Sequence, residues 1–171
     1  MPKERKISVL VQLQVPELIY DAQNKVFLTG RAKQAINEGA YANASDIQAS
    51  DDNEDAYQFM RSLATHFASL KALLADYIVE NLTTVDNKIK EEIDNDGVLK
   101  IAFLMPTNFN QTSKDAMGQG IHDYLVCKMV AEWYAINNKE DAGQYEQRAI
   151  ADYEFVRRAL YKRVRPERPT Y

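Results

Sequence analysis

Cysteine and histidine are scarce in this sequence of 171 residues, which has one cysteine, Cys127, and two histidines, His66 and His122. A single cysteine forms no internal disulfide, which agrees with a reducing compartment. Zinc fingers need several cysteines or histidines, and neither histidine follows an acid by three positions, as the ligands of helical di-metal bundles do. We therefore predict no metal ligands and no cofactor.

Residues for nucleophilic catalysis are equally few. His66 lies at the edge of an apolar stripe, where a hydrogen-bonded histidine is the simplest interpretation. His122 and Cys127 are five positions apart on a predicted helix and would point in different directions. Gly118 and Gly120 lack the third glycine of a dinucleotide fingerprint, so close helix packing is favoured. We predict no catalytic residue and expect a chain that is not an enzyme.

Long apolar runs are also missing, since no segment approaches the roughly 20 apolar residues of a membrane span. Basic residues open the chain before an apolar stretch, but Gln12 and Gln14 interrupt that stretch and no small-residue cleavage site follows. We expect no membrane association, no export and a cytoplasmic location. The length and the apolar fraction of 46% predict one domain over residues 1–165, with an extended tail at residues 166–171.

Alternating apolar residues between Ile7 and Val15 predict a strand with one buried face, which Pro16 ends. Helical spacing then predicts a first helix over residues 16–28, or in the alternative to residue 37, followed by a loop at residues 39–53. The acidic run at residues 51–55 lacks the glycine and final glutamate of a calcium loop and suits a helix start. A second helix is predicted from there to about Val79.

A short apolar run, Val98 to Met105, follows the turn residues Asn95, Asp96 and Gly97 and predicts the second arm of a β-hairpin. The first arm would cover residues 87–93, which suit a helix equally well. Thr112 with Asp115 resembles a capping box for a third helix, and Asn138 followed by Asp141 can start a fourth helix. The predicted fold class is mainly α: a four-helix domain with an antiparallel helical hairpin at its C-terminal end, a small β-hairpin and an N-terminal strand.

Charge is divided unevenly along the chain. Residues 157–171 carry six basic residues and one acid, which gives +5, and the total of -4 leaves -9 for the rest. Arginines near a helix C-terminus can simply offset the helix dipole. Arginine and tyrosine together are also typical of interfaces. The predicted partner-binding residues are Arg158, Tyr161, Lys162, Arg163, Arg165, Arg168 and Tyr171.

The C-terminal half also carries a resemblance. The segment Leu-Met-Pro-Thr-Asn-Phe-Asn at residues 104–110 precedes helices with Tyr124, Trp133 and Tyr145, and Leu-Tyr-Lys-Arg at residues 160–163 follows. This order resembles small prophage-encoded proteins of Bacteroidetes-type bacteria, which are similar to head-tail connector (adaptor) proteins of tailed phages. The resemblance implies an oligomer-forming subunit that contacts portal or tail proteins and, if phage-derived, a location in the virion.

Two other classes of function stay open at this point. The basic C-terminal region also suits a nucleic-acid or regulatory binding module, although we do not expect nucleic acid as the partner. A small-ligand binder or an enzyme whose pocket forms only in the fold is the other alternative. Of the three classes, the sequence favours a structural assembly protein.

Overall fold

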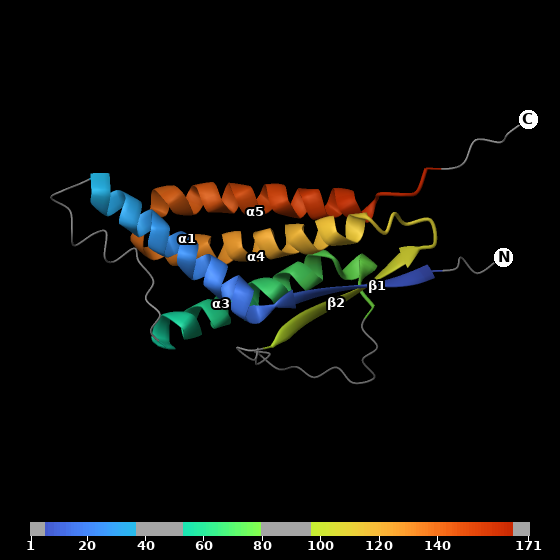
Figure 1. Ribbon diagram of the computed structural model, residues 1–171, viewed down its shortest axis with the longest axis horizontal. Coiled ribbons are helices and arrows are strands. Elements are labelled where there is room, and N and C mark those ends of the chain that lie inside the picture. Colours follow the sequence, from blue (N-terminus) through green and yellow to red (C-terminus); the bar gives the residue numbers. More distant parts are fainter. Residues whose placement is uncertain (1–5, 37–52, 80–96, 166–171) are drawn as a thin grey trace, which may run out of the picture.

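The computed structural model describes residues 6–36, 53–79 and 97–165 (Figure 1). Its elements, in chain order, are β1 (Lys6–Gln14), α1 (Val15–Ile36), α3 (Asn53–Leu73), the short 3-10 helix η1 (Ala75–Tyr77), β2 (Val98–Pro106), α4 (Ser113–Asn137) and α5 (Lys139–Leu160). The mainly helical fold class is confirmed, with four α-helices and a two-stranded antiparallel sheet in this part of the chain.

The sheet pairs the N-terminal strand with the strand that precedes α4. β1 and β2 run antiparallel, with Lys6 opposite Pro106 and Gln14 opposite Val98. Alternation buries one face of each strand, as period-two patterns require. The buried side chains are Val9, Val11, Leu13, Leu99, Ile101, Phe103 and Met105. The hairpin arm expected at residues 87–93 lies outside the described residues, so β1 is the strand partner that the structure gives to β2.

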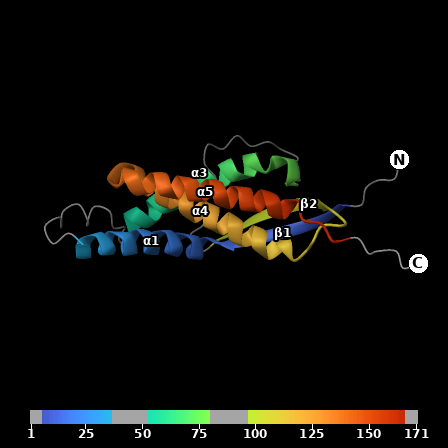
Figure 2. The ribbon, with the colours of Figure 1, turned by 90° about the horizontal axis from the view of Figure 1, so that it is seen from above.

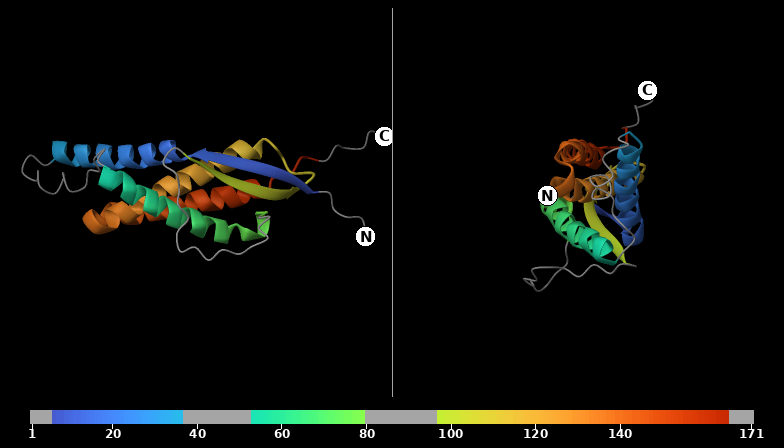
Figure 3. Two further views of the ribbon diagram at one scale, coloured as in Figure 1. Left: turned by 90° about the horizontal axis from the view of Figure 1, so that it is seen from below. Right: turned by 90° about the vertical axis from the view of Figure 1, so that its left-hand side faces the viewer.

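α4 is the central element of the fold. Figures 1 and 2 show α5 running antiparallel along one side of α4, and the end view in Figure 3 shows α1 and α3 flanking the sheet on the other side. Gly120 allows the close approach of α4 and α5, because a Cβ there would lie 2.7 Å from Val156 Cγ2 and 2.9 Å from Phe155 Cδ1. Because α4 packs against α5 on one side and against the sheet, α1 and α3 on the other, it is buried over most of its circumference, unlike the amphipathic helices around it.

One helix boundary follows the longer alternative and another differs from that expected. α1 continues through Gly30 to Ile36, as the alternative end at residue 37 predicted. α3 ends at Leu73, six positions before Val79, because the chain there turns to pair with β2. The backbone N–H of Val79 donates to the carbonyl oxygen of Ala102 at 2.9 Å. Strand-like pairing at the second edge of β2 thus replaces the last predicted turns of the helix.

α4 and α5 begin where expected, directly after Thr112 and Asn138, but the capping box predicted at Thr112 is wrong. Neither Thr112 nor Asn138 makes a side-chain cap to its helix. The Thr112 hydroxyl instead donates to Asn110 Oδ1 at 2.6 Å, and the Thr112 N–H donates to the same oxygen at 3.1 Å. The Asn138 side-chain amide donates to Asp141 Oδ2. In both places a neighbouring polar side chain competes with the helix N-terminus for the capping group.

Candidate functional site

One end of the molecule is built by backbone pairing between the segment after α5 and the loop before α4. The N–H of Val164 donates to the Asn108 carbonyl at 2.8 Å, and the N–H of Asn110 donates to the Lys162 carbonyl at 3.2 Å. Phe109, only 2% exposed, fixes this loop in the core. Residues 161–165 therefore have a defined position beside the start of α4, as Figure 1 shows at the right of the view.

Five exposed cations gather at this end from separate parts of the chain. Arg158, Lys162 and Arg165 come from α5 and the segment after it, Lys114 from the first turn of α4, and Lys6 from the strand position opposite Pro106. We call these five residues the basic end. Within the described ranges 6–36, 53–79 and 97–165, none of them has an ion-pair or side-chain hydrogen-bond partner.

The other predicted partner-binding residues have different positions. Arg163 is used locally, because its Nη1 donates to the carbonyls of Leu160 at 2.8 Å and Lys162 at 3.1 Å and so caps the end of α5. Tyr161 is 56% exposed, and its hydroxyl meets that of Tyr77. This hydrogen bond is the main cause that raises the pKa of Tyr77. Arg168 and Tyr171 lie outside the described residues.

A groove between α3 and α4 lies toward the opposite end, where α4 ends and α3 and α5 begin; we call this the groove end. The groove has a volume of about 270 Å³. Its lining residues are Gln58, Phe59, Ser62, Met129, Glu132, Trp133, Ile136 and Asn137. Trp133 stacks on Phe59 with ring centroids 5.0 Å apart, and Ile136 is 82% exposed. We call this site the α3–α4 groove.

A polar cluster lies beside the α3–α4 groove and shares Ser62 and Glu132 with its lining. The buried Ser62 hydroxyl donates to Glu132 Oε2, and His66 Nε2 lies 2.9 Å from the same oxygen. Burial lowers the pKa of His66, as does Lys128, whereas Glu132 and Glu146 raise it. The imidazole is therefore neutral at neutral pH and leaves the Glu132 charge uncancelled. Ser62 donates to Glu132 and not to His66, so this arrangement is not that of a nucleophile with its activating histidine.

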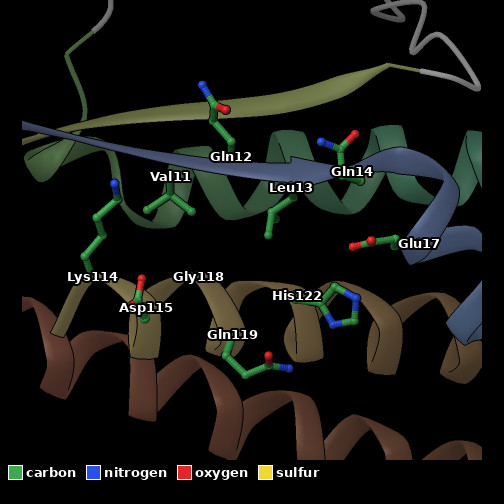
Figure 4. Close-up of a pocket in the computed structure, with 10 residues that line it drawn as sticks. All are labelled: Val11, Gln12, Leu13, Gln14, Glu17, Lys114, Asp115, Gly118, Gln119 and His122. Atoms are coloured by element: carbon green, nitrogen blue, oxygen red, sulfur yellow. The ribbon is translucent and has the colours of Figure 1, made fainter. Parts of the chain in front are cut away.

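A second cleft, of about 280 Å³, lies between β1 and the start of α4. Figure 4 shows Val11 and Leu13 pointing from β1 toward α4, while Gln12 and Gln14 point away. His122 lies at one side of this cleft, with Nε2 3.2 Å from Asp21 and Nδ1 3.4 Å from Asp123. These two contacts position the imidazole between helices α1 and α4.

Cys127 is not activated. It is 4% exposed, and burial is the main cause that raises the pKa of its thiol to about 11, so the reactive thiolate is not formed near neutral pH. Asp152 is its polar neighbour, whereas His122 is bound to Asp21 and Asp123. The structure does not bring the histidine and the cysteine together as a catalytic pair.

The sequence indicated only part of these sites. It singled out the C-terminal cations, but Lys6 and Lys114 join them through the sheet register and the loop pairing. The α3–α4 groove was missed entirely. A signal existed in Ser62 and His66, which are four positions apart on one helix and so share a face. Their common partner, Glu132, is contributed by another helix.

Among the described residues, no three histidine, cysteine or acidic side chains are placed to hold a metal ion. No helix in those same ranges has the length and apolar character needed to cross a bilayer. Comparisons of the chain with models of protein families, with curated proteins and with solved structures gave no match in any of the three.

Proposed function

We propose that this chain is a non-enzymatic structural subunit that assembles with copies of itself through its basic end, in the manner of a head-tail connector. One observation carries the proposal. Five exposed cations from β1, α4, α5 and the segment after α5 lie at the same end of the molecule, and none has an ion-pair partner in the part of the chain that the structure describes. Crowding of like charges destabilises a compact protein, and an acidic partner surface would relieve that cost.

The helix dipole does not explain this grouping. A cation in the last turn of a helix, such as Arg158 in α5, is favoured by the dipole. Lys114 lies in the first turn of α4, where the dipole disfavours a cation, and Lys6, Lys162 and Arg165 lie outside helices. Four of the five cations therefore need another explanation, and contact with an acidic surface supplies one.

A second copy of the chain offers such a surface. The chain outside residues 157–171 carries a net charge of -9, against +5 within that region. At the groove end, α3 begins with Glu54 and Asp55, and α5 begins with Glu140 and Asp141. An interface between the basic end of one copy and the groove end of the next joins two different surfaces, and repetition of such contacts closes a ring or extends a filament.

The polar residues with catalytic potential support a structural role. His66 shares Glu132 with Ser62, His122 lies between Asp21 and Asp123, and the Cys127 thiol stays protonated. The connector assignment itself rests on the resemblance at residues 95–169. It implies portal or tail proteins as further partners and a location in the virion.

The test measures molar mass by light scattering as protein concentration and salt are varied. We expect the wild-type chain to form a defined oligomer that weakens at high salt, because exposed charges are screened. Arg158→Glu, Lys162→Glu and Arg165→Glu together should leave it monomeric and folded. A matched control with equal charge change, Lys25→Glu, Lys100→Glu and Arg148→Glu, changes residues outside both the basic end and the groove end and should still assemble.

Two outcomes contradict the proposal. Equal loss of assembly in the two triple variants would show that net charge, not the basic end, controls association. A wild-type chain that stays monomeric and instead binds random duplex DNA with a steep salt dependence would favour the nucleic-acid alternative.

A further inference from the structure

The α3–α4 groove has the size and lining of a receptor for one aromatic side chain. Its volume of about 270 Å³ falls just below the roughly 300–1,000 Å³ typical of small-molecule sites. Phe59, Met129 and Trp133 supply an apolar floor, and Ile136 is 82% exposed at its rim. An exposed isoleucine beside a tryptophan in a concave site is typical of surfaces that bury an anchor residue from a partner.

The charge of the groove selects what accompanies that side chain. Glu132 is the charged residue of its lining, and Ser62 and His66 both contact Oε2 of its carboxylate. A carboxylate beside an aromatic floor fits a peptide in which an arginine lies near a tyrosine.

The chain itself contains such a peptide at residues 165–171, Arg-Pro-Glu-Arg-Pro-Thr-Tyr. We propose that the α3–α4 groove binds residues 165–171 of a neighbouring copy, with the ring of Tyr171 in the groove and an arginine on Glu132. This inference rests on the proposed assembly function and names the two surfaces that meet.

Geometry requires the segment to come from another copy. The pairing of Val164 with Asn108 fixes the start of the segment beyond the N-terminal end of α4. Ile136 is 23 residues along α4 from Ser113, which at about 1.5 Å per residue is about 35 Å. The six residues from 166 to 171 span at most about 21 Å when fully extended. Trp133 is 20 residues along α4 from Ser113, or about 30 Å by the same measure, so the segment is too short to place its backbone at Trp133 or Ile136 of its own chain.

Trp133 reports on the groove directly, because it is the single tryptophan of the chain. The receptor for the experiment is the full-length chain with Tyr171→Ala, whose own segment lacks the anchor. The ligand is a synthetic peptide of residues 165–171. We expect a saturable change in Trp133 emission, and a peptide with alanine in place of the tyrosine should bind about tenfold more weakly or worse, as for other buried aromatic anchors.

Two receptor variants locate the binding. Ile136→Glu changes a residue that is 82% exposed, so the fold should be preserved while a carboxylate enters the rim and peptide affinity falls. Glu132→Gln keeps acceptors for Ser62 and His66 but removes the charge, and it should weaken the peptide severalfold. Phe27→Glu, at an exposed apolar residue of α1, is the control and should bind the peptide as the parent does.

The inference and the assembly function fail in different ways. If the wild type oligomerises and peptide addition leaves Trp133 emission unchanged, the groove is not the receptor, although assembly stands. Unaltered peptide affinity in Ile136→Glu would also overturn the groove assignment. If the wild type is monomeric at every concentration and salt tested, the assembly function itself is wrong.

Discussion

The basic end and the groove end hold their charges differently. At the groove end, negative charges occupy the first turns of α3 and α5, where the helix dipole stabilises them, and Asp141 is also bound to Lys33 at 2.7 Å. At the basic end, Lys114 opposes the dipole of α4 and no described acid neutralises it. The acids of the groove end therefore stabilise the folded chain. Much of the charge at the basic end lowers its free energy of unfolding, and binding of an acidic partner would offset that loss.

The largest expected effect concerns the close packing of α4 against α5, the two helices that connect the basic end to the groove end. Replacing Gly120 by valine should destabilise the whole domain by roughly 1–3 kcal/mol, since a Cβ there would clash with Val156 and Phe155. Gly143→Ala is the control, because nothing lies within 4 Å of a Cβ at that position. It should stabilise α5 by about 0.5–1 kcal/mol. Urea unfolding measures both, and equal stability of the two variants would contradict the close packing of α4 and α5.

A smaller effect separates folding from assembly at the basic end. Lys114→Glu should raise the free energy of unfolding by about 0.3–1 kcal/mol, because an acid suits the first turn of α4, and should weaken self-association. Arg158→Glu should weaken association too, but it should lower the unfolding free energy, since it places an acid in the last turn of α5. Changes in stability of the same sign in both variants would show that dipole effects do not distinguish these cations.

The smallest effect concerns the groove end and depends on pH. The pKa of His66 lies below its ordinary value of 6.5, so the unfolded chain binds this proton more readily than the folded one. Stability is therefore full above pH 6.5 and falls as the pH drops from there toward the folded-state pKa. Glu132, Ser62, Lys128 and Glu146 are the polar groups around the ring.

Chemical unfolding of the wild type and His66→Gln at pH 7.5 and pH 5.5 measures this dependence. The loss between the two pH values should be smaller in the variant, because glutamine does not titrate. Identical losses would show that His66 does not contribute. The lysines and arginines of the basic end keep their charge over this range, and the difference between the wild type and His66→Gln isolates the contribution of the groove end.

Local patterns in the sequence predicted the elements well and their partners less well. The alternation from Ile7 to Val15 identified β1, because one face of the strand is buried. Its pairing with β2 depends on residues about 100 positions away, and no local pattern contains that information. The early end of α3 has the same origin, since the pairing of Val79 with Ala102 overrides helical propensity there.

The two sites also divide into residues that are close in sequence and residues that meet only in the fold. Arg158, Lys162 and Arg165 are close in sequence, and their clustering was visible before the fold. Lys6 reaches them through the sheet register, and Glu132 reaches Ser62 through helix packing. Residues that meet only in the tertiary structure were therefore the ones that sequence reasoning missed.

The pairing of β1 with β2 also sets an order of events during synthesis of the chain. Lys6 is made 100 residues before its partner Pro106. At about 5–20 residues per second, the strand waits on the order of 5–20 seconds for that partner. Throughout this interval the backbone of β1 has no β2 to pair with, and its apolar face has no α4 to pack against. That apolar face therefore needs shielding by the ribosome surface or a chaperone until β2 and α4 are made.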